Sequence, residues 1–446
     1  MTAAVSAKRA TAITAAEAAA LVKSGMWLDY GFGMGQPDLF DRALAARRDE
    51  LNDVKIRSAL TMKARPTQDS DPQGAHFHWF SWHFSGYDRA RHDEGRCNYI
   101  PMNFGEAPDY YRRFIEPVDI VVLKTCPMDA DGVFNFGGAA TYQRATVERA
   151  RCVIVEVSET MPYCHGPDNG VHVSEVDFVI QGDGEPIPVI GNPAPTDVDR
   201  KVAEQIVGEI AHGACLQIGI GGMPNAVCAT LKDSGVRDLG IHTEMMSDGI
   251  ISLYEAGLVT GARKTIDRGK MVYTFAAGSQ RQYEVLNHNS EALCYPVDYT
   301  NLPHNIMQNA GVVSINNTTQ IDLQGQAASE SDGHRHLSGT GGQLQFVRGA
   351  YASEGGKSFL CMSSTYDKRG DRRSRIVLNL TPGNVVTTPR TDTMYVVTEF
   401  GMVNLKGKSV AERAKALISI AHPDFREGLE RQAREHGLMP KGLTLR

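Results

Sequence analysis

The stretch that decides how this chain is organised is Gly240-Ile241-His242-Thr243-Glu244-Met245-Met246-Ser247-Asp248-Gly249. An apolar, strand-like run from Leu239 to Thr243 ends at Glu244, and apolar residues with helical spacing follow. We therefore expect a buried strand that leads into a helix, with Glu244 at the junction. The first turn of a helix exposes backbone N–H groups and favours an anionic side chain, so a glutamate here can also be purely structural.

Two parts of the chain, residues 15–44 and 202–231, share one order of features. Each reads as a helix, a glycine, an apolar strand, a glycine-rich turn, a proline and a second helix. This repetition predicts an α/β protein with two similar open α/β domains that descend from one unit. Two prolines and a glycine within residues 190–196 mark a boundary, so we expect domains at 1–192 and 197–446.

The alignment of the two parts extends to the next strand of each, residues 53–59 and 238–244. It places Ala59 opposite Glu244. Since the sister strand does without a carboxylate, the fold does not require one at this place. We interpret Glu244 as a residue with a chemical role.

Short apolar runs rich in β-branched residues predict further buried parallel strands. These runs are residues 119–124, 152–157, 311–316 and 394–398. Apolar residues recur at helical spacing in the tail from Ser409 to Gly437, which predicts helix there.

The composition limits the classes of function. At 446 residues the chain can form two domains with sizeable cores, and 42% hydrophobic with 22% charged residues is ordinary for a soluble globular protein. The net charge of −6, without a basic block, argues against nucleic acid as a partner, and no apolar run approaches a membrane span. Eight scattered cysteines without a CxxC pair, and no apolar secretory signal, predict a reduced, cytoplasmic protein.

Two glycine-rich loops could bring backbone close to a ligand. Gly219-Ile220-Gly221-Gly222-Met223-Pro224 follows a strand and opens a helix, a context that lets N–H groups approach an anion or a developing oxyanion. Pro224 replaces the third glycine of GxGxxG, so the loop is not a dinucleotide fingerprint, and a tight turn without a ligand fits equally well. The second loop, Gly339-Thr340-Gly341-Gly342-Gln343-Leu344-Gln345-Phe346, combines glycines with polar side chains.

Histidines and aromatic residues gather in residues 76–83. His76 and His78 would point the same way on a strand and could bind a metal. No matching cluster of ligands stands nearby in the sequence, so we expect a packed aromatic segment or an interface, and no metal.

With Glu244 and both glycine loops in view, the chain resembles the class I coenzyme A transferases. It is most similar to the 4-hydroxybutyrate and butyryl-CoA:acetate transferase branch of the acetyl-CoA hydrolase/transferase family. The matching stretches are residues 218–227, 240–249, 325–327, 339–346 and 408–425, with looser matches at 31–44 and 126–132. The family usually carries an acid where this chain has Gln345. Residues 78–88 resemble the itaconate CoA-transferase subgroup, which moves CoA from succinyl-CoA to itaconate.

The resemblance implies a ping-pong reaction in which Glu244 is the nucleophile and carries a glutamyl-CoA thioester. It implies that coenzyme A is a substrate rather than a bound cofactor, that no metal takes part, and that the chain forms a homo-oligomer. Backbone N–H groups near residues 221–222 or 341–342 become candidate oxyanion donors. The expected CoA-binding residues are Gly219, Gly221, Gly222, Met223, Pro224, Asn225, Gly339, Gly341, Gly342 and Gln343.

The distal carboxylate of a succinyl or itaconyl group needs a cation or several donors when it is buried. Lys63 and Arg65 follow the first-half strand that parallels the Glu244 strand. We expect Arg65, or failing that Lys63, to bind this carboxylate, although both could be solvated loop charges. Two other functions stay open at this point: an acyl-CoA hydrolase on the same scaffold, and a sensor of sugar phosphates or nucleotides.

Overall fold

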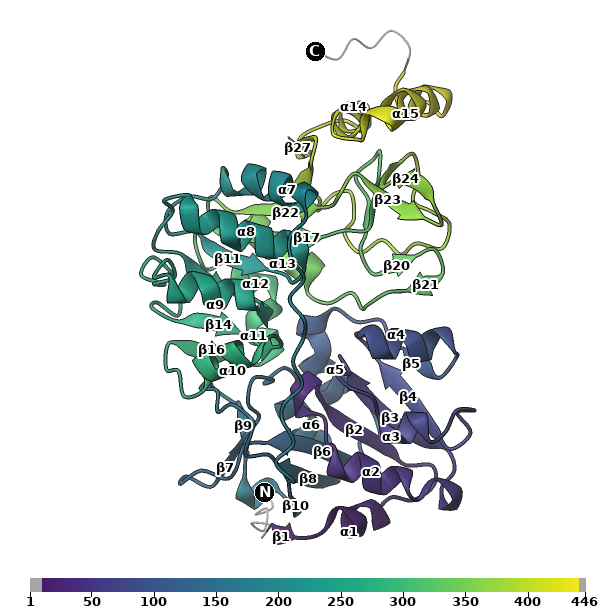
Figure 1. Ribbon diagram of the computed structural model, residues 1–446, viewed down its shortest axis with the longest axis vertical. Helices are drawn as coiled ribbons and strands as arrows, with labels where there is room; N and C mark the ends of the chain where they lie inside the picture. The colour runs from purple at the N-terminus through teal and green to yellow at the C-terminus, as the bar shows by residue number, and fades with distance from the viewer. Residues whose placement is uncertain (1–9, 441–446) are drawn as a thin grey trace. The chain divides into compact units, whose positions relative to one another are not determined.

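The computed structural model describes residues 10–440, which contain two eight-stranded sheets (Figure 1). Contacts between Cα atoms divide the chain into two compact units. Unit 1 comprises residues up to 191, residues 244–246 and residues 272–300, and unit 2 comprises the rest. The division is not a single cut in the chain, and the predicted domain boundaries at 192 and 197 stay predictions.

The first sheet has the strand order β1-β10-β8-β6-β2-β3-β4-β5, and its neighbouring strands pair in parallel. Its strands are β1 Thr11–Ala12, β2 Trp27–Phe32, β3 Val54–Ala59, β4 Phe77–Ser81, β5 Cys97–Tyr99, β6 Ile120–Thr125, β8 Cys152–Val157 and β10 Phe178–Gln181. The helices between them are α1 Ala15–Ala20, α2 Leu39–Ala45, α3 Pro66–Asp69, α4 Gly86–Asp93, α5 Ala107–Arg113 and α6 Gln143–Arg149. Strands β7 Val133–Asn135 and β9 Gly170–His172 form a separate antiparallel pair.

The second sheet has the order β16-β14-β12-β11-β17-β22-β26-β27. Its strands are β11 Cys215–Ile218, β12 Gly240–His242, β14 Met271–Tyr273, β16 Ala292–Cys294, β17 Val312–Asn317, β22 Lys357–Cys361, β26 Tyr395–Thr398 and β27 Gly401–Asn404. The longer helices after residue 196 are α7 Asp197–Val207, α8 Gly222–Asp233, α9 Asp248–Glu255, α10 Gln280–Leu286, α13 Gln343–Ala352, α14 Val410–Ser419 and α15 Pro423–Glu435. Only the edge strand β27 runs antiparallel among the pairings described for this sheet, against β26.

The two sheets share one strand order. Reading the second from β27 to β16 matches β2 with β11, β3 with β12, β6 with β17 and β8 with β22. The backbone repeats as well: Gly25 and Gly213 have φ of 84° and 77°, and Asp53 and Asp238 have φ of 58° and 59°. The predicted internal repetition of an α/β unit is confirmed.

The central strands form where the sequence predicts them because their side chains are buried on both faces. On β6 and β8, Val122 and Ile154 pack into one apolar cluster, whereas Val121 and Val155 pack into another. This alternation is the period of two that a strand imposes. All eight cysteines are free and seven are buried, so they pack as small apolar side chains. Within residues 10–440, no helix has the length and apolar character that crossing a bilayer requires.

Candidate active site

Glu244 lies between β12 and a short strand, β13 Met245–Met246. The prediction that a helix starts directly after Glu244 is wrong, because α9 begins only at Asp248, with Ser247 as its N-cap. Both methionines are buried, and β13 pairs in parallel with β15, Phe275–Ala276. The pairing holds these residues extended, so helix-dipole arguments do not apply to Glu244.

The backbone at Glu244 is fixed on both sides. Its carbonyl oxygen accepts hydrogen bonds from the N–H groups of Thr274 at 3.0 Å and Phe275 at 3.2 Å. The carbonyl oxygen of Met246 accepts one from the side-chain amide of Gln282 at 2.7 Å. The side chain of Glu244 is half-buried. These hydrogen bonds hold the backbone that carries the Glu244 carboxylate in one place.

An apolar cluster adjoins Glu244 and explains the alanine of the sister strand. Met245 packs in a cluster that includes Ala59, Phe32 and Phe275, and the rings of Phe32 and Phe275 are 4.8 Å apart. Ala59 is fully buried there. A carboxylate in its place would be desolvated among apolar side chains, which is costly.

The first glycine loop joins β11 to α8. Gly221 is the N-cap of α8 with φ of 116°, a conformation that favours glycine, and no side chain caps this helix. A Cβ on Gly222 would stand 2.7 Å from the Asp199 carboxylate, so that glycine is also needed for packing against α7. Met223 and Pro224 are buried within α8, whereas residues 219–222 are more accessible. The assignment of Met223 and Pro224 as CoA-binding residues stays a prediction.

The matching helix start in unit 1 is already occupied by the protein's own carboxylate. Glu156 on β8 accepts hydrogen bonds from the N–H groups of Asp38 at 2.7 Å and Phe40 at 2.9 Å, at the start of α2. The matching strand of unit 2, β22, contains no Asp or Glu. At the start of α8 the Asp199 carboxylate of α7 lies beside Gly222, but its Oδ2 oxygen accepts its hydrogen bonds from Thr196. Backbone N–H groups at a helix start suit an external anion.

The side chain of Asn225 is tied to the segment before α7, because its amide donates to Pro193 O at 3.1 Å and to the side chain of Asn192. Asn225 thus holds the first glycine loop to this segment. Its assignment as a CoA-binding residue stays a prediction.

The second glycine loop precedes α13, with Gly342 as the N-cap and Gly341 at φ of 57°. The side chain of Gln343 fixes this loop. Its amide donates to Asn317 O at 2.8 Å, and its oxygen accepts from the hydroxyls of Ser329 at 2.7 Å and Thr388 at 3.2 Å. This bonding anchors the loop to the end of β17. The roles of Gly339, Gly341, Gly342 and Gln343 in binding CoA stay predictions.

Glu330 is a buried acid beside this loop that sequence reasoning did not single out. It is 3% exposed and accepts hydrogen bonds from the hydroxyls of Thr340 at 3.3 Å and Thr387 at 3.2 Å. Burial raises the pKa of Glu330, and the two hydroxyls only partly oppose this. Gln345, where the family usually has an acid, is buried on α13.

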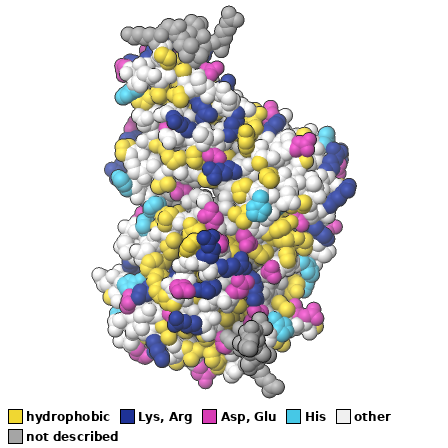
Figure 2. All heavy atoms as spheres, turned by 180° about the vertical axis from the view of Figure 1, so that it is seen from behind, with side chains coloured by type: hydrophobic (Ala, Val, Ile, Leu, Met, Phe, Trp, Pro, Cys, Tyr) yellow, Lys and Arg dark blue, Asp and Glu magenta, His cyan; other side chains and the backbone are white. Residues whose placement is uncertain are grey.

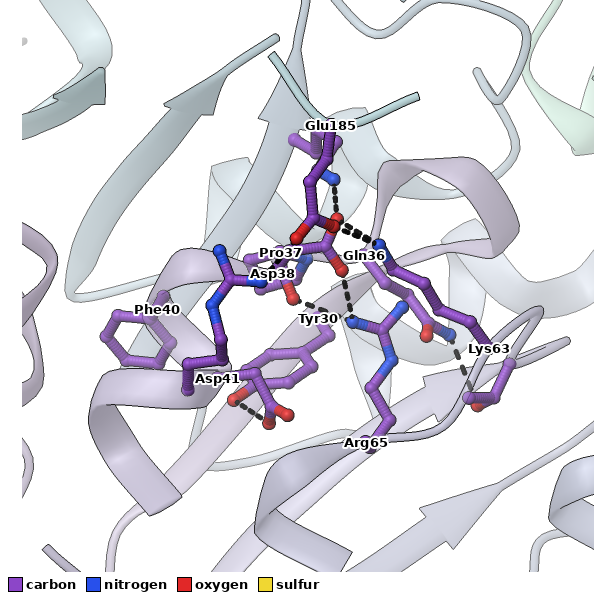
Figure 3. Close-up of polar contacts among 12 residues, drawn as sticks. Tyr30, Gln36, Pro37, Asp38, Phe40, Asp41, Lys63, Arg65 and Glu185 are labelled. Carbon is purple, nitrogen blue, oxygen red and sulfur yellow. Dashed lines mark hydrogen bonds and ion pairs between the residues drawn. The ribbon is translucent and has the colours of Figure 1, made fainter. Parts of the chain in front are cut away.

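Arg65 and Lys63 belong to a charge cluster in unit 1 (Figure 3). Arg65 is 1% exposed and donates to Pro37 O at 2.8 Å and to the Asp38 carboxylate at 3.0 Å. Lys63 is partly exposed and pairs with Asp38 at 2.7 Å and Glu185 at 2.8 Å. The alternative that both are solvated loop charges does not hold for Arg65. Binding of a substrate carboxylate by either residue stays a prediction, and each already has an acidic partner.

Asp38 is the centre of this cluster, because Lys124 also pairs with it. Burial opposes ionisation of Asp38, but the charges of Arg65 and Lys124 prevail and hold its pKa below the ordinary value. Among the residues that the structure describes, no group of three or more His, Cys, Asp and Glu could hold a metal ion.

Two repeated open α/β sheets with glycine loops at their helix starts define a CoA-transferase-like fold. Residues 8–191 match the acetyl-CoA hydrolase/transferase N-terminal domain, and residues 278–433 match its C-terminal domain. The chain belongs to the acetyl-CoA hydrolase/transferase family.

Characterised relatives align over nearly the whole chain. A butyryl-CoA:acetate CoA-transferase from Anaerostipes caccae is 48% identical, over 94% of this chain and 95% of its own length. A succinyl-CoA:cyclohexane-1-carboxylate CoA transferase from Geobacter metallireducens is 44% identical, over 94% of each chain. The crystal structure of RipA from Yersinia pestis superimposes with a TM-score of 0.87 at 38% identity, over 96% of this chain and 98% of the other. Together these findings indicate an acyl-CoA:carboxylate CoA-transferase.

Proposed function

We propose that this chain moves coenzyme A from an acyl-CoA to a free carboxylate through a glutamyl-CoA thioester on Glu244. The observation that carries the proposal is the half-buried carboxylate of Glu244 on a backbone held by Thr274 and Phe275. The matching strand has the buried Ala59 instead, so the acid is not a feature of the repeated fold. The relatives from Anaerostipes caccae and Geobacter metallireducens are both named as CoA-transferases, which supports the same reaction class.

Two half-reactions account for the atoms. A carboxylate oxygen of Glu244 attacks the thioester carbonyl carbon, the C–S bond breaks, and a mixed anhydride and a CoA thiolate form. The thiolate then attacks the glutamyl carbonyl and expels the first carboxylate, which leaves a glutamyl-CoA thioester. An incoming carboxylate reverses both steps. Positioning and exclusion of water are needed, because a carboxylate is a weak nucleophile and each intermediate can hydrolyse.

Unit 2 supplies the glycine loops of the proposal. The uncapped start of α8 and the loop before α13 present backbone N–H groups, which suit an oxyanion or a phosphate. In unit 1, the carboxylate of Glu156 accepts hydrogen bonds from the N–H groups at the corresponding helix start. This supports the proposal that the N–H groups at the start of α8 bind an anion.

For the substrates we propose succinyl-CoA as donor and itaconate as acceptor, on the similarity of residues 78–88 to the itaconate subgroup. Succinyl-CoA also appears in the name of the Geobacter metallireducens relative, whereas the Anaerostipes caccae relative is named for butyryl-CoA and acetate. An acyl-CoA hydrolase is the second candidate within this family. A cytoplasmic location and a homo-oligomer are further predictions from the sequence.

The test is incubation with succinyl-CoA and a panel of itaconate, acetate, butyrate and 4-hydroxybutyrate, followed by mass detection of new thioesters. Omitting the acceptor measures hydrolysis. Borohydride added with the acyl-CoA should modify the Glu244 peptide and inactivate the enzyme. Glu244→Ala should abolish transfer, and Glu255→Gln, a change at an exposed glutamate of α9, should not. Full transferase activity in Glu244→Ala would end the proposal, and CoA release that no acceptor increases would favour the hydrolase.

A further inference from the structure

Unit 2 also contains a cavity of about 640 Å³, which lies between β27 and α14. This volume is in the range of pockets that hold small molecules. Three lysines and one glutamate are the charged residues among those lining it. The lining residues are Val403, Asn404, Lys406, Lys408, Glu412, Lys415, Ala416 and Ser419.

The acid of this cavity already has a structural role. Glu412 closes the capping box of α14, where its carboxylate accepts hydrogen bonds from the N–H and the hydroxyl of Ser409, each at 2.7 Å. Three lysines against this one glutamate leave the lining with an excess of positive charge, although the protein as a whole carries −6. On the face shown in Figure 2, basic and acidic side chains are interspersed. A cationic hollow on an acidic protein concentrates anions locally.

The loop that carries Lys406 and Lys408 is tied down. Arg413 donates to the carbonyl oxygens of Lys408 at 3.2 Å, Gln324 at 3.2 Å and Arg390. The N–H of Lys406 donates to the Asn404 side chain at 2.9 Å. Cations that are held before a ligand arrives lose less entropy when they bind it.

The amine of Lys406 is held in place and is close to a further cation. It donates to Thr391 O at 2.7 Å and lies 4.3 Å from the centre of the Tyr351 ring, which is 59% exposed. Burial lowers the pKa of this amine, Asp392 opposes the shift, and Arg413 adds to it. An anion in the cavity would relieve this repulsion among cations.

The cavity and the glycine loops lie at opposite ends of the parallel strands. Asn404 pairs with Tyr395, the first residue of β26, so the cavity is at the amino ends of the parallel strands. The first glycine loop follows the carboxyl end of β11, and the second precedes α13 and is anchored to the end of β17. Tyr351 is about 12 Å along α13 from Gln343, at about 1.5 Å of rise per residue. The two places are separate within unit 2.

We propose that this cavity is a binding site for a small phosphorylated molecule, with Lys406, Lys408 and Lys415 as the phosphate ligands. Lysines bind phosphate as point charges, and several together favour a ligand with more than one phosphate charge. The source of the phosphates is either a free phosphorylated metabolite or the nucleotide end of coenzyme A. The site does not depend on Glu244.

The experiment is calorimetric titration of inorganic pyrophosphate into the full-length protein at low ionic strength. The test variant is Lys408→Gln with Lys415→Gln, two exposed positions that should leave the fold intact. The matched control is Lys201→Gln with Lys232→Gln, two exposed lysines on α7 and α8 that do not line the cavity. We expect the test pair to weaken binding at least about tenfold, since it removes two of three cations, and the control pair less than about twofold. Thermal melting of each variant checks folding.

Glu244→Ala should bind pyrophosphate as the wild type does, which separates this site from the proposed reaction. Displacement of pyrophosphate by CoA would identify the nucleotide end of CoA as the natural anion, and a lack of displacement would identify a separate phosphorylated metabolite. No binding to the wild type up to about 5 mM pyrophosphate, weaker than about −3 kcal/mol, would overturn the proposal. Equal weakening in the test and control pairs would overturn it as well, because it would show a general charge effect.

Discussion

Asp38→Asn is expected to destabilise unit 1 by about 3 kcal/mol, because it removes the carboxylate that pairs with Arg65 and Lys124 inside the protein. Removing one partner of a buried ion pair costs roughly 3–5 kcal/mol, since the remaining charge is left desolvated. The lower end applies here, because Asp41 also interacts with Arg65 and stays in place. Asparagine keeps the shape of the side chain, so the loss measures the charge.

Tryptophan fluorescence during urea unfolding reports unit 1 directly. The three tryptophans of the chain, Trp27, Trp79 and Trp82, all belong to this unit. The matched control is Asp183→Asn, because that acid pairs with Arg42 while 39% exposed. The control should lose less than about 1 kcal/mol, as exposed pairs do.

The prediction also says in which direction the loss of stability changes with pH. The folded-state pKa of Asp38 is lowered, so its contribution is present above the ordinary pKa of about 3.9 and is lost as the pH falls through the folded value. The difference in unfolding free energy between wild type and Asp38→Asn should stay constant from pH 8 to about pH 5 and shrink below about pH 4. A loss at pH 7 no larger than that of Asp183→Asn would refute the reasoning, and so would a difference that grows on acidification.

Two further predictions concern substrate selection and a second buried acid. Arg65→Ala should raise KM for succinyl-CoA and itaconate far more than KM for butyryl-CoA and acetate, because we expect the guanidinium to bind the distal carboxylate. Similar factors for all four substrates would instead show that Arg65 serves only Asp38 and Pro37 O. The melting temperature of Glu330→Gln minus that of the wild type should increase as the pH rises from 5 to 8. The reason is that the pKa of Glu330 is raised in the folded state, so the wild-type protein loses stability as the pH rises toward that pKa. The opposite trend with pH would show that Glu330 is stabilised as a carboxylate.

The local pattern of the chain was enough to predict the repeated unit. Apolar runs with β-branched residues predicted the parallel strands, for example residues 152–157, which form β8. Helix capping is local in the same way, since Thr14 and Glu17 form the capping box of α1 within one turn. These features depend on neighbours in the sequence, so the sequence alone determines them. The family resemblance added the reaction class and the role of Glu244 as the nucleophile.

Contacts between distant parts of the chain decided the rest. The sequence around Glu244 reads as a strand followed by a helix, but pairing of β13 with β15 keeps Met245 and Met246 extended. The carboxylate that fills the helix start of unit 1 comes from Glu156, which is 118 residues from Asp38. From its sequence neighbours Arg65 could be a solvated loop charge, but in the fold it is buried and pairs with Asp38. Strand pairing and burial of charge depend on which distant segments contact each other, and a local sequence pattern does not specify these contacts.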